Sequence, residues 1–243
     1  MCFHTSQTKK TTELENRYDV KLADESIREY FDVPRYHMNG FAHPNMLVIP
    51  QEKSNVLAPG VWGIVPSNKS KEDIKPYFKE AVKCGGGLNA RSEKVFQHFI
   101  YRGSIMENRC IIPVSGFFEP HDHKGDKYPF HFKDKENKLL ALAGLYTVID
   151  TFITFTILTK DASPLFAKIH NKKNRQPIIL DDINAHNWLS TDLIENDIKD
   201  ILKFTYPEEK LDAYSVSRDL FSPKVNSDVE TIIDEVKYEG VYI

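Results

Sequence analysis

Short apolar runs separated by turn-forming residues fill the chain from Arg109 to Leu158, and they predict a β-rich core. The runs are rich in β-branched and aromatic residues, and clusters such as His123-Lys124-Gly125-Asp126 separate them, which is typical of strands joined by turns. The expected strands span residues 110–114, 117–119, 128–132, 139–145 and 152–158. We expect these strands to form a core sheet that is largely antiparallel.

Weaker signals precede and follow this core. Residues 5–32 are polar and charged, and we expect an excursion with one short helix at 26–31. Strand-like runs follow at Met46–Ile49 and Val61–Pro66, the second closed by its proline, and another strand is expected at Pro177–Leu180.

Helices are expected outside the sheet. Ser70 and Asp73 form a capping-box-like pair that predicts the start of one helix, and apolar residues at helical spacing predict two more, at 182–189 and 192–202. We find no internal repeat and no linker in the sequence. The prediction is therefore a single β-rich α+β domain over residues 1–243, with a central sheet and peripheral helices.

Composition and charge narrow the function. Of the 243 residues, 41% are hydrophobic and 12% aromatic, as in ordinary globular proteins. The chain lacks a long apolar run and a signal-peptide pattern, so we expect a cytoplasmic protein without membrane contact. Its three cysteines, Cys2, Cys84 and Cys110, are an odd number, which favours free thiols. The net charge of −3 argues against a protein that coats nucleic acid by bulk electrostatics, but it allows a local basic patch.

The most informative candidate is Cys2, because of its position. Removal of Met1 would leave an α-amine and a thiol on one residue, which is a 1,2-aminothiol. An α-amine has a reference pKa of about 8, so part of it is unprotonated and can attack an aldehyde to form a Schiff base. The thiol can then close a five-membered thiazolidine ring. The alternative is a cysteine that stands at the second position by chance.

Two ionisable residues are candidates for proton transfer. Glu119 ends an apolar strand in the sequence Gly116-Phe117-Phe118-Glu119-Pro120, where burial among aromatic rings would raise its pKa towards acid–base use. His170 lies in an expected polar loop next to several cations, where it could shuttle protons near a phosphate backbone. The alternatives are a carboxylate exposed at a strand end and an ordinary loop histidine.

Three further residues are candidates for binding. Asn89 and Arg91 follow the permissive Gly85-Gly86-Gly87 connection, where an amide could orient an amine and a guanidinium could grip phosphate. Trp62 could stack on a base, although a core tryptophan is the commoner case. The alternative for Asn89 and Arg91 is a satisfied polar turn.

The histidines of the chain do not predict a metal site. His121 and His123 lie in an expected hairpin turn, and no cysteine or carboxylate spacing completes a zinc motif with His131. Cys84 precedes the three glycines, but the segment lacks the lysine and hydroxyl residue of a phosphate-binding loop. We therefore expect neither a metal nor a small-molecule cofactor.

Taken in order, these segments resemble the SOS-response-associated peptidase family, also called the abasic-site processing or 5-hydroxymethylcytosine-binding family. The resemblance covers nearly the whole chain and rests on an ordered set of segments rather than on any one of them. The segments are Cys2, Trp62-Gly63-Ile64-Val65-Pro66, Asn89-Ala90-Arg91-Ser92-Glu93, Arg109-Cys110-Ile111-Ile112-Pro113, Gly116-Phe117-Phe118-Glu119, Ala143-Gly144-Leu145, Phe155-Thr156-Ile157-Leu158-Thr159, Ile169-His170, Arg175-Gln176-Pro177, Val216 and Val225-Asn226.

The resemblance implies a largely β fold, binding of single-stranded DNA, and a thiazolidine link between the N-terminal cysteine and the ring-opened sugar of an abasic site. It also implies autoproteolytic removal of Met1, which is a hydrolase activity, and lyase-type Schiff-base chemistry. Carried over residue by residue, Cys2 would be the nucleophile, Asn89 would hold the N-terminus, Glu119 would be the acid–base group and His170 would assist sugar opening. Arg91 and Arg175 would contact phosphates, and Trp62 would line the DNA path.

The chain departs from the family pattern near several of these residues. Phe3 and His4 follow the cysteine where the family has Gly and Arg, and Pro120 stands where an aromatic residue usually follows the glutamate. A second tryptophan after the Trp62 segment is missing, and Lys172 and Lys173 are among extra residues before Arg175. These departures bear on phosphate contacts and base stacking.

The sequence thus predicts a DNA-damage protein that captures abasic sites in single-stranded DNA. We expect a monomer that works in the cytoplasm, at the nucleoid if the cell is bacterial. One rival is a thiol peptidase that acts on other proteins through Cys2, His170 and Glu119. The other is a non-covalent single-stranded DNA-binding module, whose binding would be salt-sensitive and would survive Cys2→Ala.

Overall fold

A five-stranded antiparallel sheet carries the start of the chain in the computed structural model, which describes residues 2–241 and, for Cys84, the backbone only. Strand β1 lies inside this sheet, between β8 and β3. In sheet order the strands are β14 (Leu211–Ser215), β9 (Asp126–Asp134), β8 (Gly116–His123), β1 (His4–Gln7) and β3 (Arg35–Asn39).

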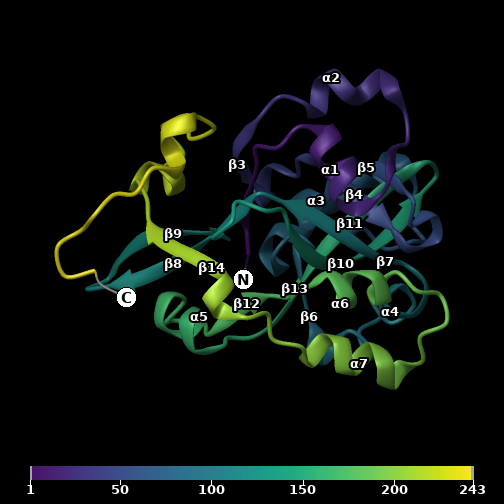
Figure 1. Ribbon diagram of the computed structural model, residues 1–243. Coiled ribbons are helices and arrows are strands. Elements are labelled where there is room, and N and C mark those ends of the chain that lie inside the picture. The colour runs from purple at the N-terminus through teal and green to yellow at the C-terminus, as the bar shows by residue number, and fades with distance from the viewer. Residues whose placement is uncertain (1, 242–243) are drawn as a thin grey trace.

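A second sheet of nine strands closes on itself. Strand β11 pairs in antiparallel fashion with β10 and in parallel fashion with β5, so that β5, β4, β7, β10 and β11 form a ring. Figure 1 shows this barrel-like body beside the smaller sheet. The strands are β2 (Lys21–Leu22), β4 (Asn45–Pro50), β5 (Val56–Trp62), β6 (Asn89–Arg91), β7 (Arg109–Val114), β10 (Leu140–Ile149), β11 (Phe152–Asp161), β12 (Arg175–Pro177) and β13 (Ile179–Leu180).

Helices surround the two sheets at the periphery (Figure 1). None of the helices between residues 2 and 241 is long and apolar enough to cross a membrane. The α-helices are α1 (Thr11–Tyr18), α2 (Arg28–Phe31), α3 (Ile74–Ala81), α4 (Ser104–Glu107), α5 (Pro164–Ile169), α6 (Asp182–Trp188) and α7 (Glu195–Lys203).

The barrel strands are buried on both faces, which explains their nearly continuous apolar sequences. Along β10, Leu140, Leu142 and Tyr146 pack into one hydrophobic cluster, whereas Ala141 and Leu145 pack into another. A strand buried on one face only would alternate apolar and polar residues. The continuous apolar sequence of β10 is therefore explained by its position between two hydrophobic clusters.

The fold confirms the predicted α+β class with a β-rich, largely antiparallel core. The predicted strands between Arg109 and Leu158 are present, most of them one to a few residues longer than expected. The expectation for residues 5–32 was wrong in part, because this segment also contains the end of β1 and all of α1. The parallel pairing of β11 with β5 was not foreseen either.

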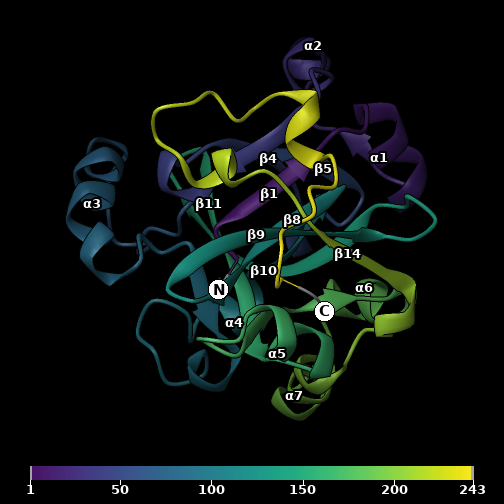
Figure 2. The same cartoon turned by 90° about the vertical axis from the view of Figure 1, so that its left-hand side faces the viewer.

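Figure 2 views the molecule from the left-hand side of Figure 1, and the label of the N-terminus lies near the centre of this view. Helix α3 lies to one side of the label, α5 lies below it, and the yellow C-terminal segment lies above it (Figure 2). In this projection, three separate parts of the chain therefore surround the entry of β1.

Candidate active site around Cys2

Cys2 lies two residues before the first residue of β1 and is fully buried. The antiparallel register pairs His4 with Phe118, so the chain before His4 runs alongside Glu119. The Cys2 thiol donates to the His4 carbonyl oxygen, with Sγ and O 3.8 Å apart. Burial, and after it the negative charge of Glu119, raises the pKa of this thiol well above its usual range. The thiol is therefore protonated in this environment, and thiol chemistry here requires a group that accepts its proton.

Asn89 holds the backbone of Cys2. Its Nδ2 donates to the Cys2 carbonyl oxygen at 2.9 Å, and β6, which carries Asn89, is fixed by parallel pairing with β11 at Ile157. The Asn89 Oδ1 atom is buried and has no hydrogen-bond partner among residues 2–241. The Asn89 side chain thus holds the Cys2 carbonyl oxygen through Nδ2 and leaves Oδ1 as a buried acceptor next to Cys2.

The three glycines before Asn89 form the tight connection that the sequence predicts. Gly85, Gly86 and Gly87 have φ angles of 89°, 64° and 67°, which residues with side chains rarely adopt. A Cβ on Gly87 would lie 2.6 Å from the Ile64 carbonyl oxygen. This geometry confirms that the connection needs glycine and that it delivers Asn89 to Cys2.

Trp62 lies in the core, which differs from its expected place along a DNA path. The indole is fully buried, and its Nε1 donates to the Leu88 carbonyl oxygen at 2.9 Å. A buried ring presents no face to a base. Because Leu88 precedes Asn89, the contact instead fixes the backbone that delivers Asn89 to the site.

Glu119 is fully buried at the point where β8 passes the start of the chain. Burial is the largest cause of its altered acidity and raises the pKa of the carboxyl to about 7. A group with this pKa can give up or take a proton near neutral pH. The structure thus puts Glu119 in the buried environment that the sequence analysis expected.

His170 is the direct neighbour of Glu119. The His170 Nδ1 lies 3.1 Å from a Glu119 carboxyl oxygen and 2.9 Å from the Arg175 carbonyl oxygen. Because a carbonyl oxygen only accepts, Nδ1 carries the proton. Burial lowers the pKa of the imidazole to about 4, so the ring is neutral at neutral pH.

The expected polar loop around His170 was wrong in part, because α5 precedes the residue and an exposed polar turn at 171–174 follows it. His170 is buried and ends helix α5, where its N–H donates to the Phe166 carbonyl oxygen at 2.7 Å. The helix has proline at its first position, and Ser163 precedes it, which is a helix-start signal that the sequence analysis missed. The helix carries His170 to Glu119 with a defined direction.

Arg175 is also placed differently from the expectation. Its buried guanidinium pairs with Glu93, with Asp161 at 2.6 Å and with the Thr159 carbonyl oxygen at 2.8 Å. The ion pair lowers the pKa of Glu93 to about 2. A guanidinium occupied in this way ties the turn after β6 and strand β12 to β11 and is not free to grip a phosphate. Arg91, in contrast, is exposed at the end of β6.

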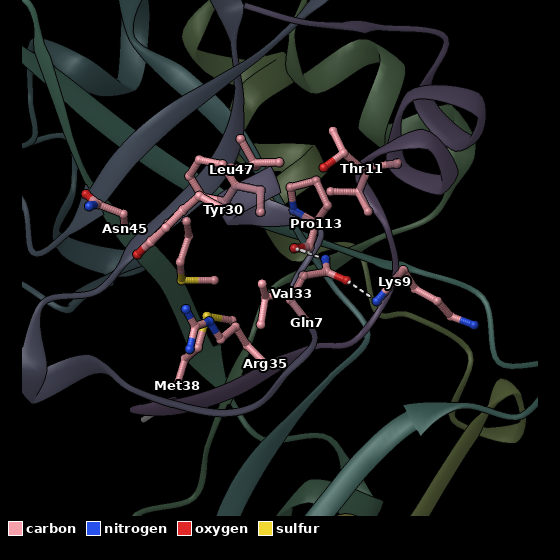
Figure 3. A pocket seen from close by; sticks show the side chains of 13 residues that line it. Gln7, Lys9, Thr11, Tyr30, Val33, Arg35, Met38, Asn45, Leu47 and Pro113 are labelled. Atoms are coloured by element: carbon pink, nitrogen blue, oxygen red, sulfur yellow. Dashed lines mark hydrogen bonds between the residues drawn. The ribbon is translucent and has the colours of Figure 1, made fainter. Parts of the chain in front are cut away.

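Two of the cavities among residues 2–241 lie near the start of the chain, and they differ in size. The enclosed cavity in Figure 3 measures about 30 Å³ and is bounded by residues such as Gln7 and Pro113, which are joined by a 3.0 Å hydrogen bond. It has room for water but not for a nucleotide. An open pocket of about 660 Å³ is lined by His4, Asn39 and Phe41, among others. Of these two pockets, the larger has the volume that a nucleotide-sized group needs.

The sequence analysis missed the residues that pack against this chain start. Gly40 donates its N–H to the Phe3 carbonyl oxygen at 2.8 Å, and a Cβ there would come within 3.2 Å of Leu88 and Trp62. Phe41 contacts the Phe3 ring, with centroids 4.9 Å apart. The Asn39-Gly40 pair at the end of a strand is a turn signal that could have marked this segment.

Comparisons with known proteins agree on one family. The family model described as SOS response associated peptidase (SRAP) matches residues 1–223. Abasic site processing protein YoqW of Bacillus subtilis (strain 168) is 31% identical over 227 residues, which are 87% of this chain and 96% of that protein. Abasic site processing protein HMCES of Gallus gallus is 28% identical over 183 residues, which are 64% of this chain and 51% of that protein.

Solved structures with a similar fold come from two bacteria. A protein from Bacteroides thetaiotaomicron superimposes with a TM-score of 0.84 at 29% identity, covering 97% of this chain and 100% of that one. A protein from Bordetella bronchiseptica superimposes with a TM-score of 0.72 at 25% identity, covering 89% and 100%.

Proposed function

Because the chain belongs to the SOS response associated peptidase family, we propose that it processes abasic sites in single-stranded DNA by covalent capture on Cys2. Relatives of this chain carry the name abasic site processing protein, which supports DNA with abasic sites as the target. The observation that carries the proposal is the placement of Cys2 between Asn89, which holds its carbonyl oxygen, and Glu119, whose charge raises the pKa of its thiol.

The first step is removal of Met1. Hydrolysis of the bond between Met1 and Cys2 consumes one water, releases methionine and leaves the α-amine of Cys2. We propose that the protein performs this step itself, with Glu119 as the group that moves protons. The buried Asn89 Oδ1 is an acceptor for the new amine, since it has no partner among residues 2–241.

The second step is capture of the lesion. The α-amine attacks the aldehyde carbon of the ring-opened sugar, and loss of water gives a Schiff base. The Cys2 sulfur then adds to the carbon of the C=N bond, and the thiol proton ends on the nitrogen. The product is a thiazolidine, and the overall reaction releases one water and needs no oxidant, reductant or cofactor.

Glu119 and His170 would divide the proton transfers. A carboxyl with a pKa near 7 can protonate the departing hydroxyl and then accept the thiol proton. His170 donates its Nδ1 proton towards Glu119 and the Arg175 carbonyl oxygen, which fixes the orientation of the ring. The imidazole would therefore position the carboxylate, and its unprotonated Nε2 would accept a proton from the sugar hydroxyl as the sugar ring opens.

The test is denaturing electrophoresis of the protein with single-stranded DNA that carries one abasic site. Met1 removal is confirmed by mass, and the controls are DNA without the lesion and the Cys2→Ala variant. A shifted band that appears only with the lesion and Cys2, and survives denaturation, supports capture. Its absence favours the non-covalent DNA binder, and turnover of unrelated peptides favours the thiol peptidase.

A further inference from the structure

Four lysines stand four residues apart along helix α3 and the 3-10 turns that flank it. These residues are Lys71, Lys75, Lys79 and Lys83, and all four are exposed. In a helix, each step of four residues turns the side chain by only about 40° and advances it by about 6 Å. Over the three steps from Lys71 to Lys83 this adds up to about 120°, so the four amines fan over about a third of the helix circumference, which we call the lysine face.

The opposite side of α3 fixes its orientation. Phe78 is buried and packs with Val65 and Ile149, and Ile74 and Tyr77 lie against the same cluster. This contact holds the apolar side inward, so the lysine face points to solvent.

The acidic residues of this segment do not neutralise the lysine face. Asp73 accepts a hydrogen bond from the backbone N–H of Ser70, and helical geometry puts Asp73 and Glu80 on another edge. Glu72 lies closest in projection to the lysines. Within residues 2–241 no ion pair involves the four lysines, whereas lysines elsewhere on the protein form several. The face thus keeps most of its positive charge although the chain as a whole is negative.

The lysine face is connected to the candidate active site by packing. Phe78 stacks on His43, with ring centroids 3.7 Å apart and planes 4° apart. His43 follows the turn that carries Phe41, whose ring contacts Phe3 next to Cys2. Figure 2 shows α3 to one side of the label that marks the start of the chain. A series of ring contacts therefore links α3 to the segment that carries Cys2.

From this arrangement we infer that the lysine face of α3 binds the phosphate backbone of the DNA arm that leads away from Cys2. The inference rests on the proposed function. Phe41 is 46% exposed between Cys2 and the helix. Aromatic rings alternating with positive charges are typical of surfaces that hold single-stranded nucleic acid. An acidic protein partner would use the charges but not the exposed ring.

The test compares two fourfold variants in a Cys2→Ala background, where binding is an equilibrium. One is Lys71→Gln, Lys75→Gln, Lys79→Gln and Lys83→Gln; the matched control is Lys53→Gln, Lys135→Gln, Lys138→Gln and Lys210→Gln, which are also exposed. Single-stranded abasic DNA is used in a short form and in forms lengthened on the 5′ or the 3′ side. Affinity is measured against salt concentration.

For lengthened DNA, loss of the lysine face is expected to reduce the slope of log affinity against log salt by about 3, since each phosphate contact to a single strand contributes about 0.7. The control variant and the short DNA are expected to keep the slope of the parent. Equal slopes for both variants on both lengthened forms would overturn the inference. This result is also the one expected if the lysine face binds an acidic protein instead of DNA.

Failure of the proposed function gives a different result. The same lysine substitutions are made with Cys2 intact, and capture of the short DNA is followed on denaturing gels. If the parent captures the short DNA but the two fourfold variants have the same salt slope, the role of the lysine face is wrong and covalent capture stands. If the parent captures nothing while the slopes separate, α3 binds DNA and covalent capture is wrong.

Discussion

The Nδ1 atom of His170 lies 3.1 Å from a carboxyl oxygen of Glu119, although neither residue is exposed by more than a few per cent. The pair joins β8 to the end of α5, two elements that are far apart in the sequence. Because the Arg175 carbonyl oxygen also accepts from this nitrogen, the Nδ1 proton is fixed and the ring faces the carboxylate as a donor. Five predictions follow from this pair and from the residues around it.

Glu119→Gln is expected to slow DNA capture by about 100-fold, because an amide cannot exchange protons as a general acid–base group does. In the parent the capture rate should change around pH 7, where the carboxyl titrates. The variant should lose this inflection and keep the one from the α-amine near pH 8. Single-turnover rates against pH measure both, with exposed Glu107→Gln as control. Identical profiles for parent and variant would exclude the assigned role.

The same substitution is expected to stabilise the protein at high pH. Burial raises the pKa of Glu119 from 4.5 to about 7, so the folded state binds the proton more tightly than the unfolded state. The stability from this proton is complete below pH 4.5 and is lost as the pH rises to 7. Glu119→Gln should therefore raise the melting temperature more at pH 8 than at pH 5, by at least about 3 °C. An equal change at both pH values would contradict a buried carboxyl with a raised pKa.

Asn89→Asp is expected to impair capture as strongly as Asn89→Ala. An aspartate cannot donate to the Cys2 carbonyl oxygen, and it adds a negative charge near Glu119. Loss of one buried hydrogen bond of about 1–3 kcal/mol corresponds to a rate loss of roughly 5- to 150-fold. Capture rates of the two variants, with Met1 removal checked by mass, test this. Normal rates in Asn89→Asp would show that the donor is not needed.

Arg175→Ala is expected to reduce stability, and Arg91→Ala is expected to weaken DNA binding. The buried Arg175 guanidinium holds Glu93, Asp161 and Thr159, so its loss should lower the free energy of unfolding by about 2 kcal/mol. Arg91 is exposed, and its loss should reduce the salt slope of DNA affinity by about 0.7 while unfolding stays unchanged. Denaturant titration and salt-dependent binding measure the two effects. A reduced salt slope in Arg175→Ala would restore Arg175 as a phosphate contact.

Trp62→Phe is expected to act through the backbone of Leu88. The phenyl ring keeps most of the apolar contacts but lacks the N–H that donates to the Leu88 carbonyl oxygen. Leaving that buried acceptor unpaired should lower stability by about 1–3 kcal/mol and should slow capture by disturbing Asn89. If Trp62 stacked on a base, Phe would replace it with little effect on stability. Unfolding curves and capture rates together distinguish the two cases.

The barrel strands could be predicted well from the sequence, because buried strands are runs of apolar residues and such runs can be recognised locally. Residues 140–149 are apolar on both faces, and no helix period competes with a strand there. The tight connection at residues 85–87 could also be predicted, since three glycines in a row favour a turn over a helix or strand. The closure of β11 on β5 was not readable, because a pairing between residues about 90 apart depends on the twist of the whole sheet.

The candidate site was predicted in part. Cys2, Asn89 and Glu119 could be singled out by position and neighbours, and the structure brings them together. Arg175 and Trp62 could not be placed correctly, because their partners are remote in the sequence. Glu93 lies 82 residues from Arg175, and nothing local distinguishes a guanidinium that pairs with it from one that meets solvent.

Strand β1 lies between β8 and β3, so the residue that would hold the DNA is attached to an interior strand of its sheet. A pull on captured DNA would act along β1 and would load the hydrogen bonds to both neighbouring strands in shear, all at once. Bonds loaded together resist force better than bonds that open one after another, as they do at a peeling edge strand. The position of β1 would therefore make the captured complex a mechanical anchor that resists a pull on the DNA.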